Sequence, residues 1–67
     1  MTHFEIHSTC KQFVICQDED GCMTTEEINN GETAMQLPTY IQASAALTDL
    51  EYFSESDVLF EIVEMQS

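Results

Sequence analysis

The sequence predicts an α+β fold in which one main helix packs on one face of a small antiparallel sheet, with the elements in the order β-β-α-α-β. Two runs typical of strands open the chain: apolar and polar residues alternate over Thr2–Ser8, and β-branched and aromatic residues are frequent over Thr9–Gln17. A stretch with helical spacing, Tyr40–Tyr52, follows the single proline, and a third strand-like run covers Val58–Met65. A chain of 67 residues is long enough for one small domain, 1–67.

The first run has the pattern of a half-buried strand. Phe4 and Ile6 alternate with His3, Glu5 and His7, which places the apolar and the polar side chains on opposite faces. The two imidazoles and the carboxylate suggest a metal site, but a strand that rises about 3.3 Å per residue separates the two His Cα atoms by roughly 13 Å. One metal with bonds of about 2 Å cannot bridge that gap, so we expect these polar side chains to face solvent.

The second run is rich in β-branched and aromatic residues, as strands are. Phe13 and Ile15 would face one side of the sheet, and Val14 and Cys16 the other. A short turn around Ser8–Lys11 would join the two runs into an antiparallel hairpin.

The segment that follows the hairpin carries two competing signals. The tetrapeptide D-E-D-G at 18–21 predicts a turn in which the glycine supplies a positive φ. The capping box Thr24-Thr25-Glu26-Glu27 then predicts a short helix over Thr25–Asn30, stopped by a glycine. The alternative is a hairpin over residues 24–37, because Asn30-Gly31 is also a strong two-residue turn signal.

The clearest helix begins after Leu37-Pro38. Thr39 and Gln42 form a second capping box, which predicts a helix over Tyr40–Tyr52 that the polar segment 54–57 interrupts. Apolar residues recur through this stretch at helical spacing, at Tyr40, Ala43, Leu47 and Leu50.

The last run predicts a strand with two partly apolar faces. Val58, Phe60 and Ile62 alternate with a set that is itself largely apolar, namely Leu59, Glu61 and Val63. Strands that are buried on both faces lie inside a sheet, so we expect a central position for this strand.

Charge is the most informative property of the composition. Thirteen Asp and Glu stand against a single basic residue, Lys11, for a net charge of −12. Net charge of this size governs association more than fold, and it favours a positively charged partner, with a solubility surface as the alternative. Binding to nucleic acid phosphates requires cations, so direct nucleic acid binding is excluded, and an anionic membrane surface would repel the chain.

The three cysteines, at positions 10, 16 and 22, cannot all pair within one chain. No export signal precedes them, so we expect buried, reduced thiols in a cytoplasm. A zinc-stabilised module built from His7 and the three cysteines is an alternative, although their spacing lacks the usual short knuckles. Nothing near Cys10 and His7 predicts an oxyanion hole, so we expect neither an enzyme nor a cofactor.

The acids gather in clusters, and one cluster lies where local structure opposes it. Asp49, Glu51, Glu55 and Asp57 surround the end of the main helix, where the negative end of the dipole makes each charge cost about 0.3–1 kcal/mol. We expect this cluster to contact a partner. A second cluster, at the start of the predicted short helix, consists of Glu26 and Glu27.

A compact domain with many unpaired carboxylates imitates the field of duplex DNA, which carries one charge per about 1.7 Å of axis. In size and charge the chain resembles, as a class, the nucleic acid mimics and host-defence inhibitors of bacteriophages, including anti-CRISPR and anti-restriction proteins. This predicts a phage or mobile-element inhibitor, monomer or homodimer, that occupies a basic nucleic-acid-binding surface in the host cytoplasm. The alternative is a small subunit or immunity-type partner that neutralises a basic protein without mimicry.

Overall fold

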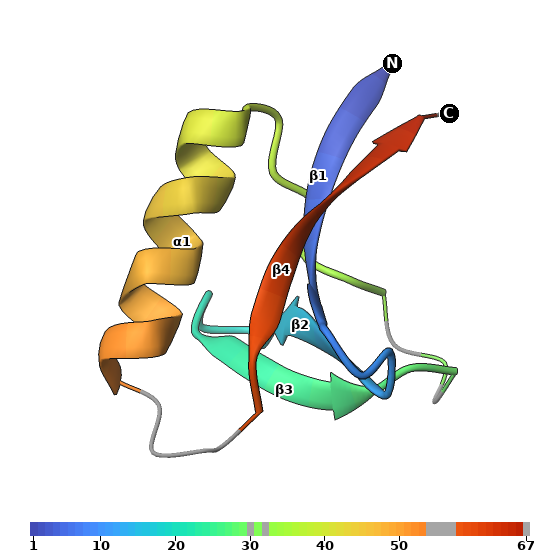
Figure 1. Ribbon diagram of the computed structural model, residues 1–67, viewed down its shortest axis with the longest axis vertical. Coiled ribbons are helices and arrows are strands. Elements are labelled where there is room, and N and C mark those ends of the chain that lie inside the picture. Colours follow the sequence, from blue (N-terminus) through green and yellow to red (C-terminus); the bar gives the residue numbers. More distant parts are fainter. Residues whose placement is uncertain (30, 32, 54–57, 67) are drawn as a thin grey trace.

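The computed structural model describes residues 1–29, 31, 33–53 and 58–66, and in this part of the chain four strands and one helix form an α+β fold. The strands make one antiparallel sheet in the order β3-β2-β1-β4. The elements are β1 (Thr2–Ser8), β2 (Phe13–Gln17), β3 (Met23–Glu27), α1 (Tyr40–Phe53) and β4 (Phe60–Gln66) (Figure 1). The predicted fold class and main helix are confirmed, but the observed order is β-β-β-α-β.

The first hairpin is formed as predicted, with His7 opposite Val14. Its turn is closed by a hydrogen bond of 3.0 Å from the Lys11 N–H to the Ser8 carbonyl, and Lys11 adopts a φ of 63°. The fully buried Ser8 hydroxyl accepts hydrogen bonds from the N–H groups of Gln12, at 3.1 Å, and Phe13, at 2.9 Å. The second strand begins at Phe13 and not at Thr9, because residues 9–12 belong to the turn.

The short helix predicted over Thr25–Asn30 is wrong, because Met23–Glu27 is a strand that pairs antiparallel with β2. A helix of that length is marginal without tertiary support, since nucleation fixes several residues for each hydrogen bond gained. The preceding turn instead places Met23–Glu27 beside β2, on the side away from β1. In it the Asp18 carboxylate accepts two backbone N–H bonds at 2.9 Å, and Gly21 has a φ of 84°.

For the alternative, a hairpin around Asn30-Gly31, the first residue of the turn lies outside the described residues. The residues beyond it bond to the first two strands: the Met35 N–H donates to the Ile15 carbonyl at 2.9 Å, and Leu37 exchanges two hydrogen bonds with Phe4. This segment thereby satisfies backbone groups that β1 and β2 would otherwise offer each other. The side chain of Met35 is buried and belongs to the core with Ile6 and Ile15.

The helix α1 begins where its capping box predicts. The Gln42 N–H donates to the Thr39 hydroxyl at 3.2 Å, and the Ala43 N–H donates to the Thr39 carbonyl at 3.1 Å. The helix packs against β1 and β4, which it flanks in Figure 1. The predicted contact face is confirmed, since Ala43 is buried and Leu47 and Leu50 pack on the core.

The core is small and lies between α1 and the sheet. Ile6 and Ile15 are fully buried, and Met35 is nearly so. Partly buried apolar residues from β3, α1, β4 and the segment before α1 surround these three: Met23, Leu37, Ala46, Leu47, Leu50 and Phe60. Tyr40, part of the predicted apolar spacing, is instead mostly exposed, with its ring edge against Phe4.

The central position predicted for the last strand is wrong, since β4 lies at the edge of the sheet next to β1. The strand begins at Phe60, two residues later than predicted, and Leu59 is exposed. Both faces of β4 are partly covered, which accounts for its apolar residues on each face. The helix α1 packs on one face, and the half-buried polar residues of β1 lie beside the other. Among the described residues, no helix has the length and apolar character needed to cross a membrane.

Candidate functional site

The predicted acidic site is described in part. Asp49 and Glu51 are exposed on the C-terminal half of α1, whose last turn contains no basic residue. Their charges therefore meet the negative end of the helix dipole, as the sequence predicts. The two other members of this cluster, Glu55 and Asp57, lie outside the described residues.

Glu26 and Glu27 occupy a different setting from the one predicted. They lie on β3 and not at the start of a helix, so no helix dipole stabilises them. As neighbours on a strand they point to opposite faces of the sheet: Glu26 is half-buried opposite Val14, and Glu27 is exposed opposite Phe13. The four described acids thus come from two separate elements, α1 and β3.

The turn between β2 and β3 adds three further acids. Asp18 has a structural role, because its carboxylate accepts the N–H groups of Asp20 and Cys22. The side chains of Glu19 and Asp20 are exposed. These acids extend the negative surface of β3 towards its N-terminal end.

The single lysine is already engaged. The Lys11 ammonium forms an ion pair with the Glu61 carboxylate of β4, and both side chains are substantially exposed. Exposed pairs of this kind contribute about 0–1 kcal/mol to stability. The sequence has no other Lys or Arg, so the remaining carboxylates cannot pair with one.

A second cluster of polar side chains lies on the central strand β1. The Glu5 carboxylate accepts a hydrogen bond from His3 Nε2 at 2.8 Å on one oxygen and from His7 Nε2 at 2.9 Å on the other. The Glu5 side chain is only 12% exposed, so the prediction that these residues face solvent is wrong. Burial tends to raise the pKa of Glu5, but the hydrogen bonds and positive character of His3 and His7 outweigh it and lower the pKa.

This arrangement differs from a metal centre. Each imidazole reaches a different oxygen of Glu5, so the two ring nitrogens flank the carboxylate and do not converge on one point. Over the part of the chain that the structure describes, no three His, Cys, Asp or Glu side chains are placed to hold a metal ion.

The cysteines are only partly as predicted. Cys16 is buried, but Cys10 and Cys22 are exposed, so the expectation of three buried thiols is wrong. The Cys10 sulfur lies 3.3 Å from the Ser8 hydroxyl. Because that oxygen already accepts two N–H groups, its own hydrogen points to the sulfur. This bond, with the backbone N–H of Gln12, lowers the pKa of Cys10.

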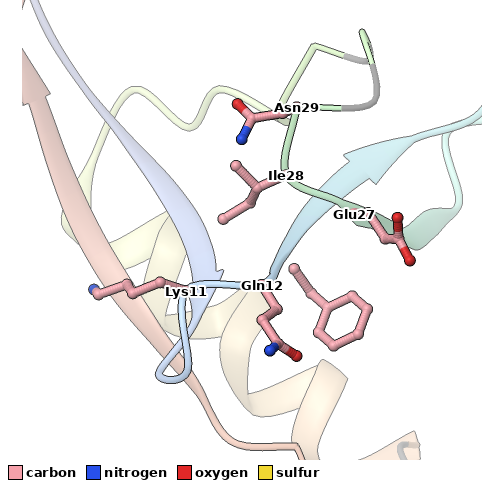
Figure 2. A pocket seen from close by; sticks show the side chains of 6 residues that line it. Lys11, Gln12, Glu27, Ile28 and Asn29 are labelled. Atoms are coloured by element: carbon pink, nitrogen blue, oxygen red, sulfur yellow. The ribbon is translucent and has the colours of Figure 1, made fainter.

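An open depression of about 410 Å³ lies where the first turn meets the end of β3 (Figure 2). The Ile28 N–H donates to the Gln12 carbonyl across this place at 2.9 Å. Figure 2 shows the Lys11 side chain extending away from Ile28. The lining contains no histidine, cysteine or serine, and consists of Lys11, Gln12, Phe13, Glu27, Ile28 and Asn29.

No family model, no curated protein and no solved structure matches this chain. The function is therefore argued from the residues and their placement.

The feature that sequence reasoning missed is the strand β3. A signal for it was present, because two β-branched residues, Thr24 and Thr25, follow a glycine turn and precede alternating exposure. The capping-box pattern covers the same residues and obscured this signal. The acids at 26 and 27 consequently belong to a sheet edge.

Proposed function

We propose that this protein is an acidic inhibitor that occupies the nucleic-acid-binding surface of another protein. The observation that carries the proposal is the charge imbalance: thirteen acids stand against Lys11, whose ammonium is engaged by Glu61. Exposed carboxylates on α1, on β3 and in the turn between β2 and β3 present negative charge to solvent. No second Lys or Arg exists in the sequence to offset them.

A surface that evolved to bind nucleic acid is the partner that this charge fits best. Such a surface is basic and binds a polyanion with one charge per about 1.7 Å of duplex axis. Complementary charge raises the rate of encounter, and carboxylates that become desolvated against Lys or Arg add specificity. The same negative charge opposes direct binding to nucleic acid or to an anionic membrane, and the proposal includes no catalytic step and no cofactor.

The proposed setting is the cytoplasm of a host cell, with a phage or mobile element as the source. The proposed targets are host-defence proteins of the kind that anti-CRISPR and anti-restriction proteins inhibit, which act on nucleic acid in the cytoplasm through basic grooves. A small acidic domain blocks such a groove without chemistry, because occupancy alone excludes the nucleic acid.

A second candidate is a subunit or immunity-type partner that neutralises a basic protein elsewhere on its surface. The placement of the described acids supports this second candidate, because Asp49 and Glu51 lie on α1 whereas Glu26 and Glu27 lie on β3. Two separate acidic elements suit two separate basic contacts as well as they suit one groove.

Capture from host lysate tests the proposal, at low and at high salt and with nuclease-treated controls. A nucleic-acid-handling protein should be retained at low salt and released at high salt, because salt screens charge over about 10 Å at 0.1 M. Duplex DNA added as a competitor should displace it. Retention that DNA does not affect would favour the second candidate, and capture of no basic protein would contradict both.

A pair of variants then locates the contact. Replacing Asp49 by Asn and Glu51 by Gln removes two charges from α1, and should slow association with the captured target by about tenfold at low salt. The matched control removes two charges from β4, which neither proposed contact uses, with Glu61→Gln and Glu64→Gln. Equal losses from both pairs would show that the charge acts diffusely.

A further inference from the structure

The strand β3 forms one edge of the sheet. Among the residues that the structure describes, it pairs with β2 alone. Two hydrogen bonds mark the ends of this ladder: Asp18 N–H to the Cys22 carbonyl at 3.0 Å, and Ile28 N–H to the Gln12 carbonyl at 2.9 Å. In an antiparallel ladder, bonded pairs alternate along the strand. The backbone groups of the even-numbered residues between these ends, 24 and 26, therefore point to β2.

The backbone groups of the alternate residues point the other way. Met23, Thr25 and Glu27 turn their N–H and carbonyl groups to the open side of β3. Thr25 and Glu27 are exposed, so solvent reaches this edge. Such a row of donors and acceptors is a template for pairing with another extended chain.

We propose that this edge of β3 accepts an extended, basic segment of the partner protein as a fifth strand. The proposal rests on the proposed function and names the surface that it uses. Charge complementarity identifies the occupant: Glu26 and Glu27 lie on β3 itself, one on each face, and the exposed acids Glu19 and Asp20 lie in the turn that leads into it. Lys or Arg side chains on either face of an added strand would meet a carboxylate, an arrangement that stabilises strand pairing.

A second copy of this chain fits the edge less well. It would bring another net charge of −12 to an edge that is already acidic, so like-charge repulsion opposes self-pairing. Acids on an edge strand are a common means of preventing self-association. The same acids attract a chain of opposite charge.

The opposite edge of the sheet differs in its surroundings. The Thr9 N–H donates to the Leu59 carbonyl, so by the same alternation Phe60, Ile62 and Glu64 of β4 point outward. The helix α1 packs against β4 and β1, whereas β3 lies at the other side of the sheet beyond β2. The edge of β4 is therefore an internal reference for any probe of β3.

The test uses the isotope-labelled full chain and a synthetic peptide of about seven alternating lysine and valine residues, which is the length of a typical strand. Binding at low salt should shift the amide resonances of Met23, Thr25 and Glu27 more than those of β4. A control peptide with the same charge, but with its central residues N-methylated so that neither edge can donate, should bind about tenfold more weakly.

A pair of variants tests the edge from the side of the protein. Thr25→Pro removes an outward donor while the bonds between β2 and β3 remain, and should weaken the unmethylated peptide by about tenfold. Thr25→Ala keeps the donor and should change affinity by about twofold or less. The comparison of the two peptides uses the unaltered protein, so it decides the question even where the proline variant fails to fold.

Four results would overturn the inference. Equal binding of the two peptides would mean that charge acts without strand pairing, which would leave the proposed function intact. Largest shifts on α1 or β4, or dimerisation of the free protein through β3, would assign the edge to another use. No binding of either peptide would also overturn the inference, whereas the lysate capture would still test the proposed function separately.

Discussion

Ser8 shows how one buried side chain organises the first turn. Its hydroxyl accepts the N–H groups of Gln12 and Phe13 and donates to the sulfur of Cys10, so all three of its bonding positions are used. The N–H groups of Gln12 and Phe13 thereby find their acceptor within the protein. The same bond gives the exposed Cys10 thiol its lowered pKa.

Replacing Ser8 by Ala should destabilise the protein. The substitution leaves two N–H groups without their acceptor, which costs about 1–3 kcal/mol where the groups are buried. Thermal unfolding measures the loss. Thr9→Ala, at the exposed next residue, is the matched control and should stay within about 0.5 kcal/mol of the wild type. Similar melting temperatures for the two variants would contradict the role given to Ser8.

Glu5 makes stability depend on pH in a defined direction. Its pKa in the folded protein lies below the usual value of 4.5. The folded chain therefore holds this proton less tightly than the unfolded chain, and the stabilisation is present above pH 4.5 and is lost as the pH falls through the lowered pKa. His3 and His7 face the carboxylate, and across the strands Glu61 lies opposite His7.

Replacing Glu5 by Gln should cost about 1–3 kcal/mol near neutral pH, because both imidazoles lose a charged acceptor. The difference between wild type and variant should shrink as the pH falls below 4.5. Denaturant unfolding at a series of pH values measures it, and the subtraction cancels the titration of the other carboxylates. A difference that is constant down to pH 3 (roughly one unit below the usual Glu value) would refute this account.

At the scale of the element, α1 has a capped N-terminus and an exposed apolar residue on its outer side. Thr39 caps it, and Ala43, Leu47 and Leu50 face the core. Yet Ile41 is 81% exposed, so apolar residues occur on both sides of the helix. Packing and not amphipathicity alone therefore decides which residues stabilise it.

Leu47→Ala should lower stability by about 2 kcal/mol, the low end for Leu→Ala because Leu47 is only partly buried. The matched control is Ile41→Ala on the same helix, which removes a similar volume from an exposed position and should cost no more than about 0.5 kcal/mol. Denaturant midpoints measure both. Equal losses would show that the core-facing side of α1 is wrongly assigned.

The acids near the end of α1 should cost stability in the free protein. Neutralising them with Asp49→Asn and Glu51→Gln relieves an unfavourable interaction with the helix dipole of about 0.3–1 kcal/mol per charge. The double variant should therefore melt at a higher temperature than the wild type. Asp20→Asn with Glu64→Gln serves as the control, since neither residue lies on α1. A lower melting temperature for the α1 variant would mean that these carboxylates have stabilising contacts.

At the scale of the whole molecule, the net charge of −12 has opposite effects on the free protein and on its proposed complex. Repulsion among like charges weakens the compact state, and salt screens that repulsion. Salt also screens the attraction to a basic partner. Salt concentration should therefore change the stability of the free protein and the affinity of the complex in opposite directions.

Raising sodium chloride from low to physiological ionic strength should raise the melting temperature of the free protein and weaken its complex with the captured target. Thermal unfolding and titration binding, run in the same buffers, measure the two effects. A neutral osmolyte at matched osmolality controls for exclusion from the protein surface. A melting temperature that falls with salt would indicate that attractive ion pairs outweigh repulsion in the folded chain.

The sequence by itself determined the features that depend on near neighbours. The hairpin of β1 and β2 and the start of α1 at Thr39 follow from patterns a few residues long, and the structure confirms them. The charge imbalance and the shared face of His3, Glu5 and His7 are likewise readable from order alone.

Only the tertiary structure decided where the remaining elements lie. A capping box and a strand compete over Met23–Glu27, and the free side of β2 favours the strand because its hydrogen bonds extend along the whole segment. The edge position of β4 and the exposure of Cys10 and Cys22 depend in the same way on distant contacts. A local pattern specifies what a segment can form, but the open backbone groups of its neighbours determine what it does form.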